Sequence, residues 1–136
     1  MSQSTERLER LLTDELGECC AADVEARLDE LDTLSDDAAG SSFDDDCGVF
    51  STLGNETRSR IARILVGADD ELCVCELEPL FDVSTSALSH ALGDLVDAGL
   101  VTRRKEGNWR YYRSTERAER LFAVLDETRD DGGVDA

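Results

Sequence analysis

Long hydrophobic runs, basic residues and proline are scarce in this chain of 136 residues. No apolar run approaches the ~20 residues that span a bilayer, and the start, Met1–Glu6, lacks the basic and apolar segments of a signal peptide. We therefore expect a cytoplasmic protein with no membrane partner. The single histidine, His90, excludes a histidine-based metal site within one chain, and the single proline, Pro79, is tolerable only in the first turn of a helix.

The charge is strongly unbalanced, with 14 Lys and Arg residues against 32 Asp and Glu residues and a formal net charge of -18. Such a surface normally repels a polyanion such as nucleic acid. The acid is spread through every segment while the apolar residues keep helical spacing, which predicts a folded chain with an acidic surface. This composition resembles that of cytosolic proteins from salt-loving archaea, where molar salt shortens the Debye length to ~3 Å. The net charge then indicates a halophile habitat and does not exclude DNA.

The length favours one compact domain with modest extensions. Stripes of leucine and valine predict a helical arm over residues 5–34, which together with an Asp-rich linker forms an N-terminal region of residues 1–42. We predict the compact domain at residues 43–115. Residues 116–136 are predicted to form a terminal helix and a fraying acidic tail.

The order of elements predicted within the compact domain is helix, short helix, turn, helix and two-stranded hairpin. Asn55 is expected to cap the first of these helices and Ser84 the last, with the short helix around residues 76–81. Runs rich in Val, Thr, Trp and Tyr over residues 100–104 and 109–113 predict the hairpin. The predicted fold class is therefore mostly α with a β-hairpin wing, a winged helix-turn-helix.

The helix after Ser84 is expected to enter the major groove of DNA. Its leucines face inward, so small polar side chains fall on the opposite face, and its amino end offers free backbone N–H groups that suit phosphate. The hairpin carries five of the cations and is predicted to straddle the DNA backbone. We predict DNA contacts from Ser84, Thr85, Ser86, Ser89, His90, Arg103, Arg104, Lys105, Asn108, Arg110 and Tyr111. An alternative is that the serines only cap a helix, that the hairpin balances nearby acid, and that His90 is an ordinary exposed histidine.

An ordered set of motifs over residues 47–115 resembles the arsenic-responsive repressor (ArsR/SmtB) family. The motifs are Asn55-Glu56-Thr57-Arg58, Glu71-Leu72-Cys73-Val74-Cys75-Glu76-Leu77, Leu88-Ser89-His90-Ala91-Leu92, Ala98-Gly99-Leu100-Val101 and Gly107-Asn108-Trp109-Arg110-Tyr111-Tyr112-Arg113. The resemblance implies a homodimeric repressor that binds an imperfect inverted repeat in double-stranded DNA, with the terminal helices as the dimer contact. It also implies release from DNA when a thiophilic metal or metalloid binds the cysteine pair.

Cys73 and Cys75 supply two soft donors that favour arsenite, antimonite, cadmium, lead or zinc over hard ions. Their sulfur atoms share a face only where the backbone is extended, because residues i and i+2 lie about 200° apart around a helix. Two thiolates do not satisfy arsenite, which takes three, or tetrahedral cadmium and zinc, which take four. Glu78 stands where the arsenite branch of the family often has a third cysteine, which puts a wholly local three-thiol site in doubt.

The remaining cysteines would have to complete such a site. The N-terminal region resembles the arm of the family's cadmium-responsive branch, whose thiols join the pair across the dimer, and this makes Cys19 and Cys20 candidate ligands. Cys47 is a further candidate. No obligatory cofactor is expected, because the metal or metalloid acts as an inducer.

Other interpretations of the cysteines remain open. In the first interpretation, Cys73 and Cys75 are small hydrophobic residues of a buried segment, and Cys47 is an ordinary core residue. In another, oxidation links Cys19 or Cys20 to a second cysteine and makes the repressor a redox sensor. A small thiol enzyme such as an arsenate reductase needs an anion-cradling loop beside its cysteine. No such loop surrounds any cysteine, so we expect no catalytic residues and no enzyme.

Overall fold

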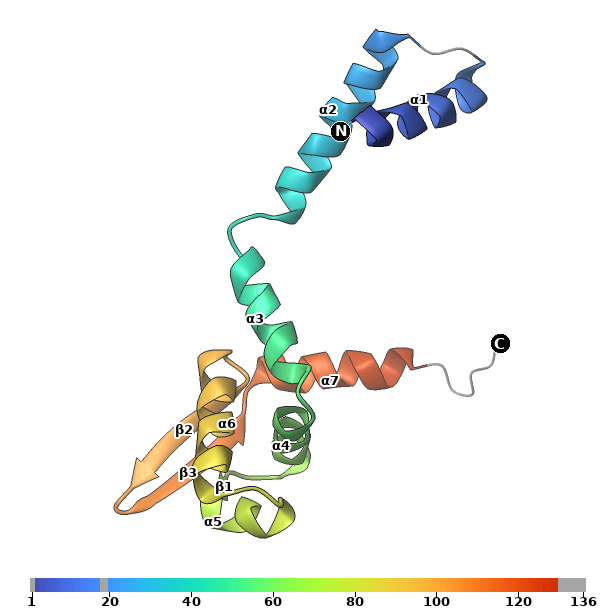
Figure 1. Cartoon of the computed structure of the whole chain (residues 1–136). Helices are drawn as coiled ribbons and strands as arrows, with labels where there is room; N and C mark the ends of the chain where they lie inside the picture. Colours follow the sequence, from blue (N-terminus) through green and yellow to red (C-terminus); the bar gives the residue numbers. More distant parts are fainter. Residues whose placement is uncertain (1, 18–19, 130–136) are drawn as a thin grey trace. The chain divides into compact units, whose positions relative to one another are not determined.

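The computed structural model describes residues 2–17 and 20–129 (Figure 1). The chain divides into two compact units, residues 1–43 and residues 44–136. None of the helices in the described ranges is long and apolar enough to cross a membrane.

The first unit consists of helices α1 (Ser2–Leu16) and α2 (Ala21–Ala38). Helix α1 ends at Gly17, whose φ of 87° lies in the left-handed region that glycine adopts without strain. Helix α2 begins after Cys20, whose backbone N–H donates a hydrogen bond to the Asp23 carboxylate (3.2 Å). The helical arm expected over residues 5–34 is thus a pair of helices that extends beyond both limits.

The second unit has the element order of a winged helix-turn-helix, as the sequence predicted. The elements are α3 (Phe43–Leu53), α4 (Glu56–Gly67), β1 (Leu72–Cys73), α5 (Val74–Leu77), the 3-10 helix η1 (Glu78–Leu80), α6 (Thr85–Asp97), β2 (Val101–Glu106), β3 (Trp109–Ser114) and α7 (Glu116–Thr128).

Side-chain caps fix where two of these helices begin. Asn55 Oδ1 accepts a hydrogen bond from the backbone N–H of Arg58 (3.0 Å), and Ser84 Oγ accepts one from the backbone N–H of Ala87 (3.0 Å). A cap of this kind stabilises a helix by about 1 kcal/mol. Both predicted caps are confirmed, so the sequence correctly predicted where α4 and α6 begin.

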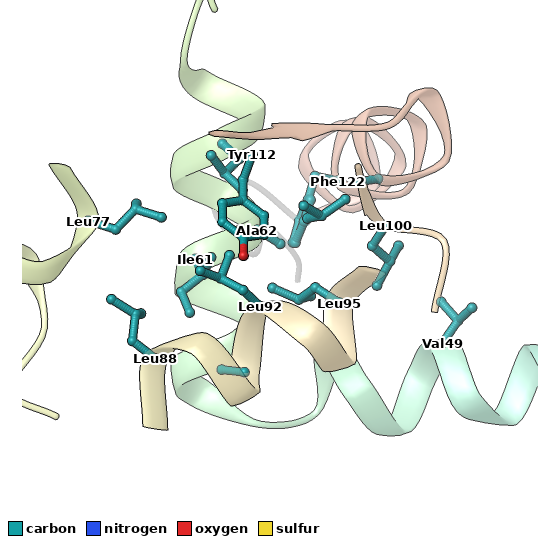
Figure 2. Packing of buried hydrophobic residues seen from close by; sticks show 14 residues of the cluster. Val49, Ile61, Ala62, Leu77, Leu88, Leu92, Leu95, Leu100, Tyr112 and Phe122 are labelled. Carbon is teal, nitrogen blue, oxygen red and sulfur yellow. The ribbon is translucent and has the colours of Figure 1, made fainter. Parts of the chain in front are cut away.

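One hydrophobic core holds the second unit together (Figure 2). Leu92 and Leu95 of α6 are fully buried against Ile61 of α4, and Tyr112 reaches the same core from β3 with only 1% of its surface exposed. Fully burying a large aliphatic side chain contributes about 1.5–3 kcal/mol. The inward-facing leucines therefore fix the rotation of α6 about its axis, which leaves its opposite face at the surface.

The β2–β3 hairpin is the wing, and it projects away from the helices of its unit (Figure 1). The strands pair antiparallel from Val101 opposite Ser114 at the base to Glu106 opposite Trp109 at the tip. Gly107 makes the turn with a φ of 63°. Both strands are longer than the runs of residues predicted from composition, because β2 continues through the charged residues to Glu106 near the tip and β3 continues to Ser114 at the base.

A two-residue strand that the sequence did not predict joins the wing. Strand β1 pairs antiparallel with β3, with Leu72 opposite Tyr112 and Cys73 opposite Tyr111, so the sheet order is β1-β3-β2. The short helix expected around residues 76–81 instead starts at Val74 and passes into η1. A strand of two residues is too short to show the alternation on which a prediction rests.

An ion pair connects α4 to α7. The Arg63 guanidinium donates two hydrogen bonds to the Asp126 carboxylate, each 2.9 Å long, and lies over the Phe122 ring at 4.4 Å from its centroid. The hydrogen bond from Arg63 is the main cause that lowers the pKa of Asp126 to about 2. The Asp126 carboxylate therefore stabilises the fold at every pH at which it is ionised and paired with Arg63.

Replacing Asp126 by Asn should destabilise the protein at neutral pH, with the deficit fading in acid. Because the native pKa of about 2 lies below the unfolded value of about 3.9, the stabilisation is present above about pH 4 and is lost as the pH falls through about 2. Denaturant midpoints measured from pH 7 downwards at constant salt would show the gap closing. Glu127→Gln removes the same charge one residue away, outside this ion pair, and an equal pH-dependent gap in that variant would contradict the account.

Candidate thiol site and nucleic-acid interface

Cys73 and Cys75 lie side by side where β1 runs into α5. Cys73 is extended, with φ of -80° and ψ of 152°, and Cys75 is in the first turn of α5. The Cys75 thiol donates to Cys73 Sγ at a sulfur–sulfur distance of 2.7 Å, and the Cys75 backbone N–H donates to the same sulfur (3.3 Å). The extended backbone therefore brings both sulfur atoms to one face, which is the condition for chelation by residues i and i+2.

A capping interaction holds this geometry. The Cys73 backbone N–H donates to Glu76 Oε1 (2.8 Å), while the Cys73 side chain caps the start of α5. This reciprocal arrangement satisfies two of the N–H groups that a helix start leaves unpaired. The motif thus favours a sharp change from strand to helix between the two cysteines.

The two thiols differ in exposure. Cys73 is 6% exposed, whereas Cys75 is exposed, so the interpretation of both as buried hydrophobes is wrong for Cys75. The hydrogen bond to Cys73 raises the pKa of the Cys75 thiol, and desolvation adds to the rise. Since a thiophilic cation must displace the thiol protons, we expect its affinity to increase with pH.

The thiol pair opens into a groove of about 550 Å³ that it shares with the wing and α6. Helix α6 contributes Ser89 to the lining. The wing contributes Lys105, Asn108, Trp109 and Arg110. All of these except Trp109 are residues that the sequence predicted to contact DNA. A ligand bound to the thiols would therefore lie directly beside the predicted DNA-binding residues.

The surface face of α6 carries the polar residues predicted to meet DNA. Thr85, Ser86 and His90 are exposed and Ser89 is half-buried. Ser84 is also exposed, but its Oγ already accepts the capping hydrogen bond of α6. His90 Nε2 lies 3.9 Å from the Asp94 carboxylate one turn further along.

Arg104 of the wing forms ion pairs with two carboxylates, those of Glu71 and Glu106. Its Nε donates to both carboxylate oxygens of Glu71 (3.0 and 3.1 Å), its Nη2 also contacts Glu71, and its Nη1 pairs with Glu106. The guanidinium lies over the Tyr111 ring at 4.7 Å from the centroid. The hydrogen bond from Arg104 lowers the pKa of Glu71. Contacts of Arg104 and Tyr111 with DNA would therefore compete with an existing internal cluster.

A second wing arginine is paired in the same way. Arg113 Nη2 lies 2.8 Å from Asp70 Oδ1. The pKa of Asp70 is lowered mainly by a hydrogen bond from the Glu71 backbone N–H and then by Arg113. Asp70 and Glu71 thus neutralise two wing cations from the segment just before β1.

Three other wing cations keep their charge unpaired. Over residues 2–17 and 20–129, no carboxylate forms an ion pair with Arg103, Lys105 or Arg110. All three are exposed. These residues are the part of the wing best placed to bind phosphate.

The other cysteines are spread over the chain. Cys19 lies outside the described residues, Cys20 is exposed at the start of α2 in the first unit, and its Sγ lies 3.5 Å from an Asp23 oxygen. Cys47 is exposed on α3, so its interpretation as ordinary core is wrong. Among the described residues, no three Cys, His, Asp or Glu side chains come together in a group that would hold a metal ion. Within the described residues the pair thus stands as two thiols, and a metal site built on it would need further ligands.

Sequence reasoning missed three residues of this region. Asp70 and Glu71 were noted only as an acidic turn and as part of a motif, although both hold wing arginines. Trp109 was assigned to a strand, although its exposed side chain also lines the groove. The ion pairs could have been predicted from two features of the sequence. Acidic residues directly precede the Cys-x-Cys motif, and the cations are concentrated on one hairpin.

Comparison with known proteins identifies the family. The family model described as "Bacterial regulatory protein, arsR family" matches residues 55–103. A relative from Halobacterium salinarum, named as a repressor ArsR of an arsenical resistance operon, is 55% identical over 126 residues, which cover 93% of this chain and 98% of that protein. The chain belongs to the ArsR family. This family and its fold are those of DNA-binding transcriptional regulators, not of enzymes.

Further relatives differ in the kind of resistance for which they are named. A second Halobacterium salinarum protein, named ArsR2 of an arsenical resistance operon, is 54% identical over 84 residues and covers 62% of this chain and 71% of its own length. The cadmium resistance regulator CadC of Listeria innocua is 40% identical over 65 residues, covering 48% of this ArsR-family chain and 54% of its own.

Solved structures share the fold. HlyU from Vibrio cholerae has a TM-score of 0.57 at 29% identity and covers 67% of this chain and 98% of its own. The homodimeric winged helix-turn-helix domain Mb0332 from Mycobacterium bovis has a TM-score of 0.61 at 28% identity, with coverage of 71% and 89%. The predicted fold class is therefore confirmed, with the wing and α6 of this chain as parts of a known DNA-binding architecture.

Proposed function

We propose that this ArsR-family protein is a repressor that leaves its operator when a thiophilic metal or metalloid binds Cys73 and Cys75. The observation that supports this most strongly is the shared groove, in which the thiol pair faces Ser89 of α6 and Lys105 and Arg110 of the wing. An inducer bound there would change the charge and shape of the surface that meets DNA. The names of relatives, which refer to arsenical and cadmium resistance, support the same ligand class.

We infer that α6 enters the major groove and that the wing holds the phosphate backbone. The exposed hydroxyls of Thr85 and Ser86 permit close approach of the helix, while His90 and Ser89 lie within the same face. The unpaired cations Arg103, Lys105 and Arg110, with Asn108 at the tip, would supply the backbone contacts. A protein with this role acts where the DNA is, in the cytoplasm.

A homodimer on an imperfect inverted repeat is the form we propose for the bound state. Phe50 of α3 and Val124 and Leu125 of α7 are between 51% and 69% exposed. These large apolar side chains are available for a symmetric contact, and one structural neighbour is a homodimer. Two copies of α6 would then read two half-sites related by the two-fold axis.

Further thiolates are required to complete the coordination shell. Arsenite takes three sulfur ligands and tetrahedral cadmium or zinc takes four, whereas the described residues bring together only Cys73 and Cys75. We propose that Cys19 and Cys20 of the N-terminal region supply the rest, with Cys47 as a further candidate. A redox switch that uses the same thiols has less support, since none of these relatives is named for an oxidant.

Cys73→Ser and Cys75→Ser should each abolish release from DNA by cadmium and by arsenite. Serine keeps the size and a capping oxygen but is a poor ligand for soft ions, so operator affinity without ligand should stay close to that of wild type. The measurement is fluorescence anisotropy on an operator selected by the wild-type protein from random-sequence DNA. Unchanged release in both variants, or enrichment of no sequence at all, would refute the proposed function. Cys47→Ser makes the same chemical change on α3, and its release shows whether that residue is a ligand.

Arg110→Ala should weaken operator binding and lower its dependence on salt. Removing one phosphate-binding side chain reduces the slope of log K against log salt by about 0.9. The control is Arg120→Ala on α7, an exposed arginine that pairs with Glu116 one turn earlier. The assignment of the wing to the DNA backbone fails if the two variants have equal slopes over a range of potassium concentrations.

A further inference from the structure

The three-stranded sheet places a thiol, an aromatic ring and a guanidinium in one row. Cys73 of β1 is opposite Tyr111 of β3, and Tyr111 is opposite Arg104 of β2. Residues that are directly opposite in antiparallel strands lie on the same face of the sheet. Arg104 Cζ lies 4.7 Å from the centroid of the Tyr111 ring. The row therefore runs from the thiol pair to a cation of the wing.

Glu71 closes this row into a loop of contacts. Its carboxylate accepts hydrogen bonds from Arg104 Nε at 3.0 and 3.1 Å, and Glu71 is joined to Cys73 along the chain through Leu72. The side chain of Glu71 is only 24% exposed, compared with 69% for Glu106, the other acid that contacts Arg104. Of the two carboxylates, Glu71 is thus the more enclosed partner and the one that directly precedes the thiol strand β1.

We propose that Glu71 is a positioning residue that couples ligand capture at the thiol pair to the placement of the wing on DNA. This inference rests on the proposed function and adds the path by which the signal travels. A ligand that takes both sulfur atoms displaces the Cys75 thiol proton and thereby removes the hydrogen bond from that thiol to Cys73 Sγ, which alters the contact between the two residues at the junction of β1 and α5. Glu71 carries that change to Arg104, and hence to the wing.

The neighbouring ion pair strengthens the same connection. Arg113 of β3 pairs with Asp70 at 2.8 Å, so two successive residues before β1 are fastened to the wing. Asp69 belongs to the same acidic turn but forms no ion pair within the described part of the chain, and its side chain is exposed. The charged atoms of these ion pairs are in direct contact. Molar salt therefore weakens their attraction less than it weakens the attraction between charges that are farther apart.

The test compares three variants of the full-length protein by the ratio of the operator dissociation constants with and without ligand. The ligands used are cadmium and arsenite, each added at saturation to the reduced protein. Glu71→Gln removes the charge and the ion pair, Glu71→Asp keeps the charge on a shorter side chain, and Asp69→Asn removes one charge from the same turn. Cadmium–thiolate absorbance and the thermal midpoint are measured in parallel, since a purely structural role of Glu71 would change the midpoint and leave the ratio of dissociation constants unchanged.

We expect the ratio for Glu71→Gln to fall by about threefold or more, within the range of ordinary coupling between two sites. Cadmium–thiolate absorbance should be retained, the ratio for Asp69→Asn should match wild type, and Glu71→Asp should restore most of the loss. Equal ratios for Glu71→Gln and Asp69→Asn, with wild type still released by ligand, would overturn the coupling and leave the proposed function standing. Failure of both ligands to release the wild-type protein would overturn the proposed function, and the coupling with it.

Discussion

The pairing of β1 with β3 is the interaction on which the rest of the site depends. It holds Cys73 in an extended conformation opposite Tyr111, so that the sulfur atoms of Cys73 and Cys75 meet at 2.7 Å and do not point to opposite sides of a helix. The same pairing makes the thiol strand part of the wing's sheet. The candidate ligand-binding thiols and the wing that we propose contacts DNA thereby belong to one small structural element.

The core explains why this element is held in a fixed position. Tyr112 alternates with Tyr111 along β3, and its ring is buried beside Leu92 and Leu95 of α6 (Figure 2). One face of β3 is therefore anchored in the core, while the other carries the row from Cys73 to Arg104. The helix that we propose reads DNA and the strand that carries the wing share a single hydrophobic core, and close-packed interiors transmit strain.

Ion pairing divides the cations of the wing into two groups. Arg104 and Arg113 are neutralised by Glu71 and Asp70, whereas Arg103, Lys105 and Arg110 remain unpaired within the described residues. In a chain with a net charge of -18, a small basic island is sufficient for DNA binding only if general repulsion is screened, as it is in molar salt. Two similar proteins come from Halobacterium salinarum.

The sequence predicted the helices and the wing because their signals are local. The caps Asn55 and Ser84 and the inward leucines of α6 follow rules that involve only a few neighbouring residues. Strand β1 was missed because it is formed by pairing with residues about 40 positions later, and no local pattern encodes such a partner. The ion pairs of Asp70 and Glu71 with the wing were missed for the same reason. The thiol pair was found as a motif, whereas the groove that it shares with the wing required the fold.

Native-state hydrogen exchange of the reduced protein with and without cadmium or arsenite tests the central claim, that the thiol strand and the wing respond as one element. The account predicts that ligand changes the protection of the backbone amides of Tyr111 and Tyr112 in β3 together with that of Cys73, while the amides of α7 keep theirs. A change confined to residues 73–77, with β3 unaltered and DNA nevertheless released, would contradict it.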